Sequence, residues 1–226
     1  MENKELLEVN SIFESINGEA GFIPQGAVTT FIRLQGCNLR CNWCDTVHGQ
    51  EFNKQDFIKI DRVVENIRTL NVLITGGEPL ARDKDKIVKL ITALLEKRKL
   101  VQIETNGSFL PLEYKFNMFN IQPFWVMDRK CPSSGETDKM ISVDDILKGQ
   151  LRFTNLKYVI KDEKDEEWAK NDIEYLLRGK FPGMFIISPL NANPSKINEL
   201  FNHFKNHPAF SRMIFSLQLH KITNMD

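Results

Sequence analysis

The most restrictive feature of this 226-residue sequence is the alternation of short apolar, β-rich segments with segments of helical period. Such alternation indicates βαβ units and a parallel sheet. The apolar runs predict strands at residues 28–34, 71–75, 100–104, 124–128, 156–160, 185–188 and 214–219. Apolar residues spaced three and four apart predict helices at residues 61–70, 83–97, 165–178 and 194–206.

The number of strands sets the expected architecture. A closed barrel of eight βα units typically needs ~250 residues, which is more than this sequence offers. We therefore expect an α/β fold, a partial and open TIM-like β/α barrel of about six parallel strands. Residues 1–226 are expected to form a single domain. Within it, the polar residues 130–151 would make a surface excursion, and residues 211–226 would form a C-terminal strand and tail.

Charge and composition argue against several classes of function. Lys plus Arg (30) equals Asp plus Glu (30), so no net charge attracts a nucleic acid or an anionic membrane. No apolar run approaches the ~20 residues that span a bilayer, and the first residues lack the pattern of a secretory signal. We expect a cytoplasmic protein with neither nucleic acid nor membrane as a partner.

Three cysteines lie close together in a C-x3-C-x2-C loop, Cys37, Cys41 and Cys44, directly after the first predicted strand. In a reducing compartment, this clustering favours a metal or iron–sulfur site over disulfides. Three thiolates can hold three irons of a [4Fe–4S] cluster and leave the fourth iron open to a ligand. A three-cysteine zinc site, or a four-cysteine zinc site completed by Cys131, stays open as an alternative on this argument.

The cysteine loop resembles the defining motif of the radical S-adenosylmethionine (SAM) superfamily. Residues 73–79, Leu-Ile-Thr-Gly-Gly-Glu-Pro, resemble the GGEP motif of that superfamily. The resemblance implies that Gly76, Gly77 and Glu78 lie near the methionine part of SAM. Glu104 closes the third predicted strand, where a carboxylate can accept hydrogen bonds from ribose hydroxyls.

The resemblance also implies a mechanism. The open iron chelates the amino and carboxylate groups of SAM, and an electron enters from an external donor such as flavodoxin or ferredoxin. SAM then splits into methionine and a 5′-deoxyadenosyl radical, which takes a hydrogen atom from the substrate. The protein supplies placement and a dry cavity.

Three further segments resemble the 7-carboxy-7-deazaguanine synthases. Residues 13–20 (FESINGEA) resemble their F-x-S/T-I-Q/N-G-E-G signature, residues 127–135 their D-x-K-x-P-S-S-G segment, and residues 217–222 their Q-L-H-K terminus. The resemblance covers nearly the whole chain. It implies that a small-molecule pterin, 6-carboxy-5,6,7,8-tetrahydropterin, is converted to 7-carboxy-7-deazaguanine with loss of ammonia, in the biosynthesis of queuosine and related deazapurines.

The resemblance implies site residues position by position. The residues expected to contact the substrate are Ile16, Asn17, Gly18, Glu19, Arg33 and Thr75. Those expected to contact SAM, besides the GGEP residues and Glu104, are Asp128, Arg129, Lys130 and Ser188. Arg33 offers a bidentate fork to the substrate carboxylate. Thr46 falls at the position of a Mg²⁺ ligand, and Mg²⁺ takes few protein oxygens. The family also implies a homodimer.

Two departures from the family pattern limit this transfer of roles. Ala20 stands where the signature ends in glycine, and the residues after Ile222 lack the aromatic, proline and basic stretch of the relatives. Two other functions stay open: a glycyl-radical enzyme activase, which shares the cysteine and GGEP motifs, and a non-enzymatic zinc or iron–sulfur module. The pterin-type signature at residues 16–19 argues against the activase. Cys131 is expected to be structural.

Overall fold

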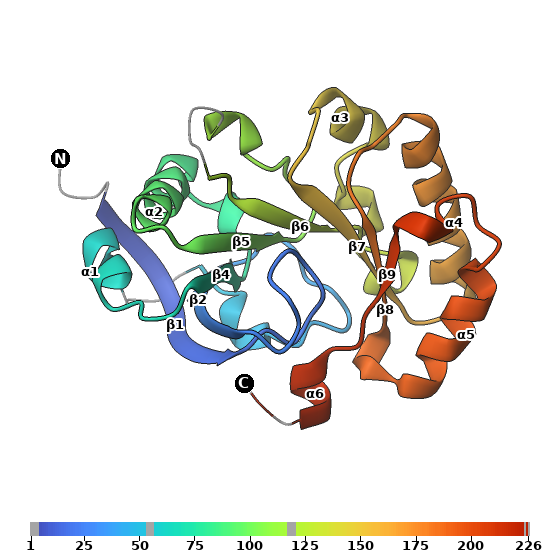
Figure 1. The fold of residues 1–226 in the computed structure, drawn as a ribbon, viewed down its shortest axis with the longest axis horizontal. Coiled ribbons are helices and arrows are strands. Elements are labelled where there is room, and N and C mark those ends of the chain that lie inside the picture. The colour runs from blue at the N-terminus through green and yellow to red at the C-terminus, as the bar shows by residue number, and fades with distance from the viewer. Residues whose placement is uncertain (1–4, 53–56, 117–120, 224, 226) are drawn as a thin grey trace.

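The computed structural model of the chain describes residues 5–52, 57–116, 121–223 and 225. Its strands are β1 (Leu6–Ile16), β2 (Val28–Leu34), β3 (Phe57–Lys59), β4 (Asn71–Gly76), β5 (Leu100–Thr105), β6 (Phe124–Asp128), β7 (Thr154–Ile160), β8 (Phe185–Pro189) and β9 (Met213–Phe215). Within the described residues they form one sheet in the order β3-β1-β2-β4-β5-β6-β7-β8-β9. Figure 1 shows this sheet crossing the molecule, with α1 and α2 toward one end and α4 and α5 toward the other.

In the described sheet, β2 and β4 to β9 pair with their neighbours in parallel. Because β2 and β9 do not pair with each other, the barrel is open. This confirms the expected α/β fold, with seven parallel strands where about six were expected. The strands β1 and β3, which were not predicted, pair antiparallel at one edge. A register shift between Val9 and Ser11 interrupts the alternation in β1 and hides this strand in the sequence.

The helices are α1 (Ile60–Glu65), α2 (Lys84–Glu96), α3 (Val143–Lys148), α4 (Glu163–Arg178), α5 (Pro194–Phe204) and α6 (Leu219–Thr223). Short 3-10 helices are η2 (Val47–Gly49), η3 (Pro79–Ala81), η4 (Glu113–Lys115), η5 (Pro132–Ser134), η6 (Thr137–Lys139), η7 (Leu190–Ala192) and η8 (Phe210–Arg212). Three of the predicted helices begin where the side chains of Asp83, Asp162 and Asn193 accept backbone N–H groups of the first turn. None of the helices in the described ranges has the length and apolarity that crossing a bilayer requires.

Two predicted elements are shorter than expected. The helix predicted at 61–70 ends at Glu65, because the chain then turns toward β4 and Lys99 donates hydrogen bonds to the carbonyl groups of Ile67 and Thr69. The strand predicted at 214–219 ends at Phe215, and Leu219 begins α6. The C-terminal segment is therefore a short strand followed by a helix.

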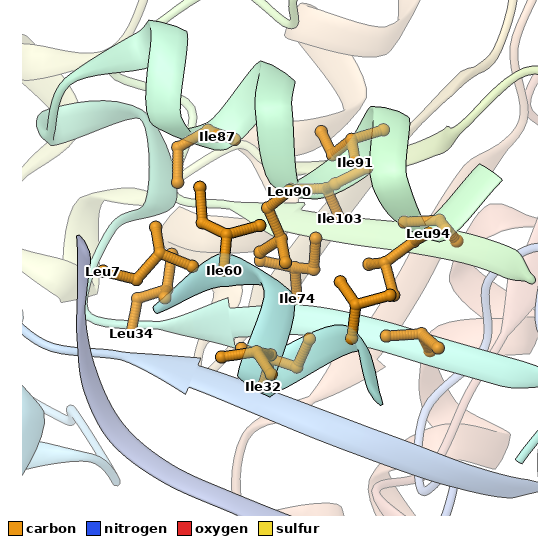
Figure 2. Close-up of a cluster of buried hydrophobic side chains, with 14 of the residues drawn as sticks. Leu7, Ile32, Leu34, Ile60, Ile74, Ile87, Leu90, Ile91, Leu94 and Ile103 are labelled. Atoms are coloured by element: carbon orange, nitrogen blue, oxygen red, sulfur yellow. The ribbon is translucent and has the colours of Figure 1, made fainter. Parts of the chain in front are cut away.

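One apolar core lies between the outer face of β2, β4 and β5 and the helices α1 and α2. Figure 2 shows Ile74 and Ile103 of the strands close to Leu90 and Ile91 of α2, and all four side chains are fully buried. Burial of such a side chain contributes about 1.5–3 kcal/mol. Because successive strand residues point to opposite faces, the neighbours of Ile74 and Ile103 face the inside of the barrel.

A second apolar core lies between β6, β7, β8 and the helices α3, α4 and α5. Residues 130–151, expected as a surface excursion, contribute a few side chains to this core, while most of the segment is exposed or half-buried. Cys131, Ile146 and Leu151 are buried there, and α3 begins at a cap in which Ser142 accepts the N–H group of Asp145. A few apolar side chains anchor this segment although most of its residues are polar.

The loop of residues 17–27 between β1 and β2 covers the inner face of the sheet near the amino ends of the strands. Gln102 of β5 accepts hydrogen bonds through Oε1 from the N–H groups of Phe22 (2.9 Å) and Ile23 (3.0 Å). Ala20 packs against Val126 in a small apolar cluster on the same face. The loop leaves the carboxyl ends of the strands open.

Candidate active site

A cavity opens on the inner face of the sheet at the carboxyl ends of the parallel strands, where α/β sheets bind their ligands. The expected site residues that line it are Glu19, Cys37, Cys41, Cys44, Thr46, Thr75, Gly76, Gly77, Glu104, Asp128 and Lys130. The expected site residues that lie outside its wall are Ile16, Asn17, Gly18, Arg33, Glu78, Arg129 and Ser188. The fold therefore brings most of the expected groups together in one place.

Hydrogen-bond donors surround the sulfur of Cys37. The N–H group of Leu39 lies 3.4 Å and the Nδ2 atom of Asn106 lies 3.6 Å from this sulfur. Such contacts tune the potentials of iron–sulfur clusters. Burial raises the pKa of Cys37, and it raises the pKa of Cys41 to about 11, so a bound cation is needed to hold these residues as thiolates. The donor set fits an iron–sulfur cluster.

The segment after β6 holds the cysteine loop in place. The N–H group of Asn42 donates to the carbonyl oxygen of Ser134 at 2.9 Å, and Nε1 of Trp43 donates to Oγ of Ser133 at 3.1 Å. Cys131, in the same segment, is fully buried in the second apolar core, and its sulfur lies 3.6 Å from the carbonyl oxygen of Arg129. Cys131 is thus a packed side chain of the core, away from the cavity wall.

Gly76 and Gly77 bring the end of β4 against the start of the cysteine loop. Gly76 has a φ of +123°, and a Cβ atom there would lie 2.2 Å from the carbonyl oxygen of Leu34. A Cβ atom on Gly77 would lie 2.1 Å from the carbonyl oxygen of Gly36. Glycine is required at both positions by contacts within the chain. The cavity wall at this point consists of bare backbone, which a ligand can approach closely.

Glu78 lies behind the cavity wall. Its buried carboxylate accepts hydrogen bonds from the N–H group of Leu80 (2.8 Å), the hydroxyl of Thr105 (2.7 Å) and the N–H group of Asn106 (2.5 Å). Burial raises the pKa of Glu78 to about 7. The side chain of Glu78 links the ends of β4 and β5, and the expected place of this residue near SAM stays a prediction.

Thr75 and Glu104 are neighbours on the inner face of the sheet, where Oγ1 of Thr75 donates to Oε2 of Glu104 at 3.4 Å. Burial and the nearby carboxylate of Asp128 raise the pKa of Glu104 to about 7. Arg33 is the register partner of Thr75 on β2, but its guanidinium lies over the ring of Phe13, 5.0 Å from the centroid. Glu104 can therefore carry a proton near neutral pH, in the same row as two residues expected to contact the substrate.

Asp128 and Lys130 form an ion pair at the cavity wall, and the Lys130 ammonium lies 5.2 Å from the centroid of the Trp43 ring. Burial opposes the charge of Lys130, but the carboxylate of Asp128 and the nearby Cys41 hold the pKa of Lys130 above its ordinary value. The cavity therefore has a fixed ion pair between β6 and the cysteine loop.

Arg129 points away from the cavity. Its Nε and Nη2 atoms donate to the carboxylate of Asp172 at 2.9 and 2.6 Å, and Nη1 donates to the carbonyl oxygen of Ile141 at 2.6 Å. Adjacent residues of an extended chain point to opposite sides, so this side chain does not share the cavity with Asp128 and Lys130. The Arg129 side chain forms a buried ion pair with Asp172 of helix α4, and the expected contact of residue 129 with SAM stays a prediction.

The segment expected at the pterin edge lies in the loop after β1, and Glu19 is its member at the cavity wall. Asn17 is buried, and its Nδ2 atom donates to the carbonyl oxygens of Ile23 (2.7 Å) and Glu19 (2.9 Å). A Cβ atom on Gly18 would lie 2.4 Å from Nδ1 of His220, so the C-terminal helix packs directly on this glycine. Asn17 and Gly18 therefore shape the loop that presents Glu19.

Three remaining positions have simple environments. Ile16 ends β1 and is half-buried. Ser188 is buried on β8 beside Val159, a residue of the cavity wall. Ala20 has no positive φ, so an alanine is accommodated where the family signature has glycine.

The cavity wall also includes residues that the sequence did not single out: Asn106, Lys157, Gln218 and Lys221. Lys157 forms an ion pair with Glu19, and the Lys221 ammonium lies 2.9 Å from Oδ2 of Asp45. For Lys157 the sequence offered one signal, its place in the middle of an apolar strand. A lysine buried there needs an anionic partner. Gln218 and Lys221 belong to the Q-L-H-K segment, to which no role had been given.

A curated 7-carboxy-7-deazaguanine synthase from Methanospirillum hungatei is 32% identical over 223 residues, which cover 97% of this chain and 86% of the relative. The chain belongs to the 7-carboxy-7-deazaguanine synthase family. A family member from Clostridium acetobutylicum is 33% identical and covers 93% of this chain and 92% of its own length. One from Rickettsia prowazekii is 31% identical and covers 97% and 89%.

Wider comparisons concern the superfamily and the fold. Residues 31–116 match the radical SAM superfamily. The crystal structure of QueE from Escherichia coli superposes with a TM-score of 0.67 at 20% identity and covers 94% of both chains. SuiB from Streptococcus suis, bound to S-adenosylmethionine, has a TM-score of 0.55 at 16% identity and covers 80% of this chain and 45% of its own. The two structures support the fold.

Proposed function

We propose that this chain is a radical SAM lyase that converts 6-carboxy-5,6,7,8-tetrahydropterin to 7-carboxy-7-deazaguanine with loss of ammonia, in queuosine and deazapurine biosynthesis. The observation that carries this proposal is the single cavity in which the cysteine loop, the bare backbone at Gly76 and Gly77, and the carboxylate of Glu19 meet. Groups suited to a cluster, to a cofactor and to a heterocycle thereby share one pocket.

Membership of the family supports a [4Fe–4S] cluster and SAM as cofactors. Cys37, Cys41 and Cys44 would hold the cluster, since all three line the cavity and the sulfur of Cys37 accepts hydrogen bonds from Leu39 and Asn106. When bound, the cluster and SAM supply the one-electron chemistry that amino-acid side chains lack.

The side chains of the cavity would then place the reactants. The Lys130 ammonium, which is paired with Asp128, has further N–H groups that can donate to a ligand beside the cysteine loop. The carboxylate of Glu19 can accept N–H groups of a pterin. Glu104, whose pKa is about 7, can hold or release a proton within the cavity.

Further partners are proposed on the family resemblance. Thr46 lines the cavity beside the cysteine loop and would give one oxygen to Mg²⁺, with substrate oxygens and water as the other ligands. The enzyme would act in the cytoplasm as a homodimer and receive electrons from flavodoxin or ferredoxin.

Anaerobic reconstitution followed by incubation with SAM, a reductant, Mg²⁺ and carboxytetrahydropterin tests the function. The expected result is 7-carboxy-7-deazaguanine, identified by mass spectrometry, together with released ammonia. Cleavage of SAM without this product would favour the activase. One zinc ion per chain and no sulfide would overturn the radical enzyme altogether.

The same preparation tests the cluster ligands. Cys41→Ala should lose the intact cluster, because two thiolates cannot hold it as three do. Cys131→Ala is the matched control and should keep iron and sulfide, since Cys131 lies in the second apolar core.

A further inference from the structure

Lys157 is a buried lysine in the cavity for which neither the family motifs nor the proposed chemistry has a role. It lies in the middle of β7, a strand in which every residue is buried, and it is 7% exposed. Burial of an ammonium group costs several kcal/mol unless a good anionic partner compensates. A lysine at this buried position therefore requires an anionic partner for its ammonium group.

The partner of Lys157 is Glu19, in the loop after β1. Oε2 of Glu19 accepts from the Lys157 ammonium, and Oε1 of the same carboxylate accepts from Nε2 of Gln218. The other nearby carboxylate, Asp128, is the register neighbour of Lys157 on β6, but it is already paired with Lys130. Burial lowers the pKa of Lys157 to about 7, and Glu19 is the carboxylate that pairs with its ammonium form.

The three side chains come from distant segments and meet at the cavity wall. A carboxylate has about four acceptor positions, and the two donors leave others free. Gln218 is 5% exposed, and its Oε1 atom is buried without a hydrogen-bond partner in the described part of the chain. A buried unpaired acceptor beside a cavity indicates that a further polar group belongs there.

We infer that Lys157 is a positioning residue, which together with Gln218 holds the Glu19 carboxylate at the cavity wall, where it can accept the N–H groups at the edge of a bound pterin. This inference rests on the proposed function. In this inference Lys157 affects pterin binding through Glu19. Lys157 itself makes no contact with SAM.

A double-mutant cycle with Lys157→Met and Glu19→Gln tests the inference. The reconstituted enzyme is assayed for the KM of carboxytetrahydropterin, for kcat and for the dissociation constant of SAM. Equilibrium dialysis of the stable analogue 6-carboxypterin gives a binding readout that needs no turnover. Loss of a charge-assisted hydrogen bond corresponds to about 10- to 100-fold in affinity. We expect Lys157→Met to raise the pterin KM and the 6-carboxypterin dissociation constant by this factor, with SAM affinity unchanged within about twofold.

Three further results are expected. In the Glu19→Gln background, Lys157→Met should have little additional effect, because its action passes through Glu19. Lys157→Arg should restore most of the pterin affinity, since it keeps the charge. Lys170→Met removes another partly buried ion pair, with Glu166 on α4, and should leave pterin affinity as it is. If Lys157→Met does not fold, Gln218→Met removes the second donor and should raise the same constants about fivefold.

The inference is overturned if Lys157→Met raises the pterin constants as much in the Glu19→Gln background as in the wild type. It is also overturned if SAM affinity falls instead, or if pterin affinity does not change. Failure of the proposed function has a different signature, namely wild-type enzyme that yields no deazaguanine product. If such a protein still binds 6-carboxypterin, the cycle is read from dialysis alone. Wild-type protein that binds no pterin overturns both.

Discussion

The carboxylate of Glu78 accepts a hydrogen bond from the hydroxyl of Thr105 at 2.7 Å and so joins the carboxyl ends of β4 and β5. Two backbone N–H groups, of Leu80 and Asn106, donate to the same carboxylate. The acidic residue of the GGEP segment is therefore a support behind the cavity wall. Removal of this carboxylate should therefore first lower the free energy of unfolding.

We predict that Glu78→Ala lowers the free energy of unfolding by about 3 kcal/mol or more, because three buried donors lose their acceptor at about 1–3 kcal/mol each. Urea denaturation of the cluster-free protein measures this. Glu65→Ala is the control: Glu65 forms an exposed ion pair with Arg62, which is worth at most about 1 kcal/mol. Equal effects of the two variants would contradict the support role.

The raised pKa of Glu104 predicts a pH-dependent stability. Burial and Asp128 raise its pKa from 4.5 to about 7 in the folded state, so folding favours the protonated carboxyl. This contribution is complete below pH 4.5 and is lost as the pH rises through 7. Glu104→Gln imitates the protonated form. Its advantage in unfolding free energy over wild type should grow from near zero at about pH 4.5 to at most about 3 kcal/mol at about pH 8. Urea denaturation across this range measures it, and an advantage that is constant with pH would argue against the shift.

The contact between Asn106 and Cys37 predicts an effect on the cluster. Asn106→Ala removes the amide donor that lies 3.6 Å from the sulfur, and a donor at that position stabilises the reduced cluster. The reduction potential should fall on the order of tens of millivolts, as followed by a redox titration with EPR detection. Asn38→Ala removes the other partner of the Asn106 amide, at 2.9 Å, and should leave the potential nearly unchanged. A similar shift in both variants would mean that loop rigidity matters and not the contact with sulfur.

Thr46 predicts a metal dependence. Thr46→Ala should weaken the activation of turnover by Mg²⁺, because the variant lacks the hydroxyl proposed as a ligand. Thr46→Ser keeps the hydroxyl and should behave like wild type. Turnover of EDTA-treated enzyme as a function of added Mg²⁺ measures both. An unchanged dependence in Thr46→Ala would remove this residue from the metal site.

Much of the fold follows from local patterns. Apolar runs and three-to-four spacing located the parallel strands and the long helices, because burial of one face imposes those periods. The patterns failed at β1, where a register shift at Val9 and Ser11 interrupts the alternation, and around α3, where a few apolar side chains of a mostly exposed segment reach the core. Both failures occur where a contact distant in sequence outweighs local composition.

The sequence by itself determined which chemistry is available, since three closely spaced thiols, paired glycines and the signature segments are properties of short stretches of chain. Only the tertiary structure decided which side chains share the cavity. Asp128 and Lys130 face it while Arg129 does not, because a strand turns adjacent residues to opposite faces and the packing of the sheet chooses between them. The meeting of Glu19 with Lys157 joins positions 138 residues apart, and no local pattern specifies that distance.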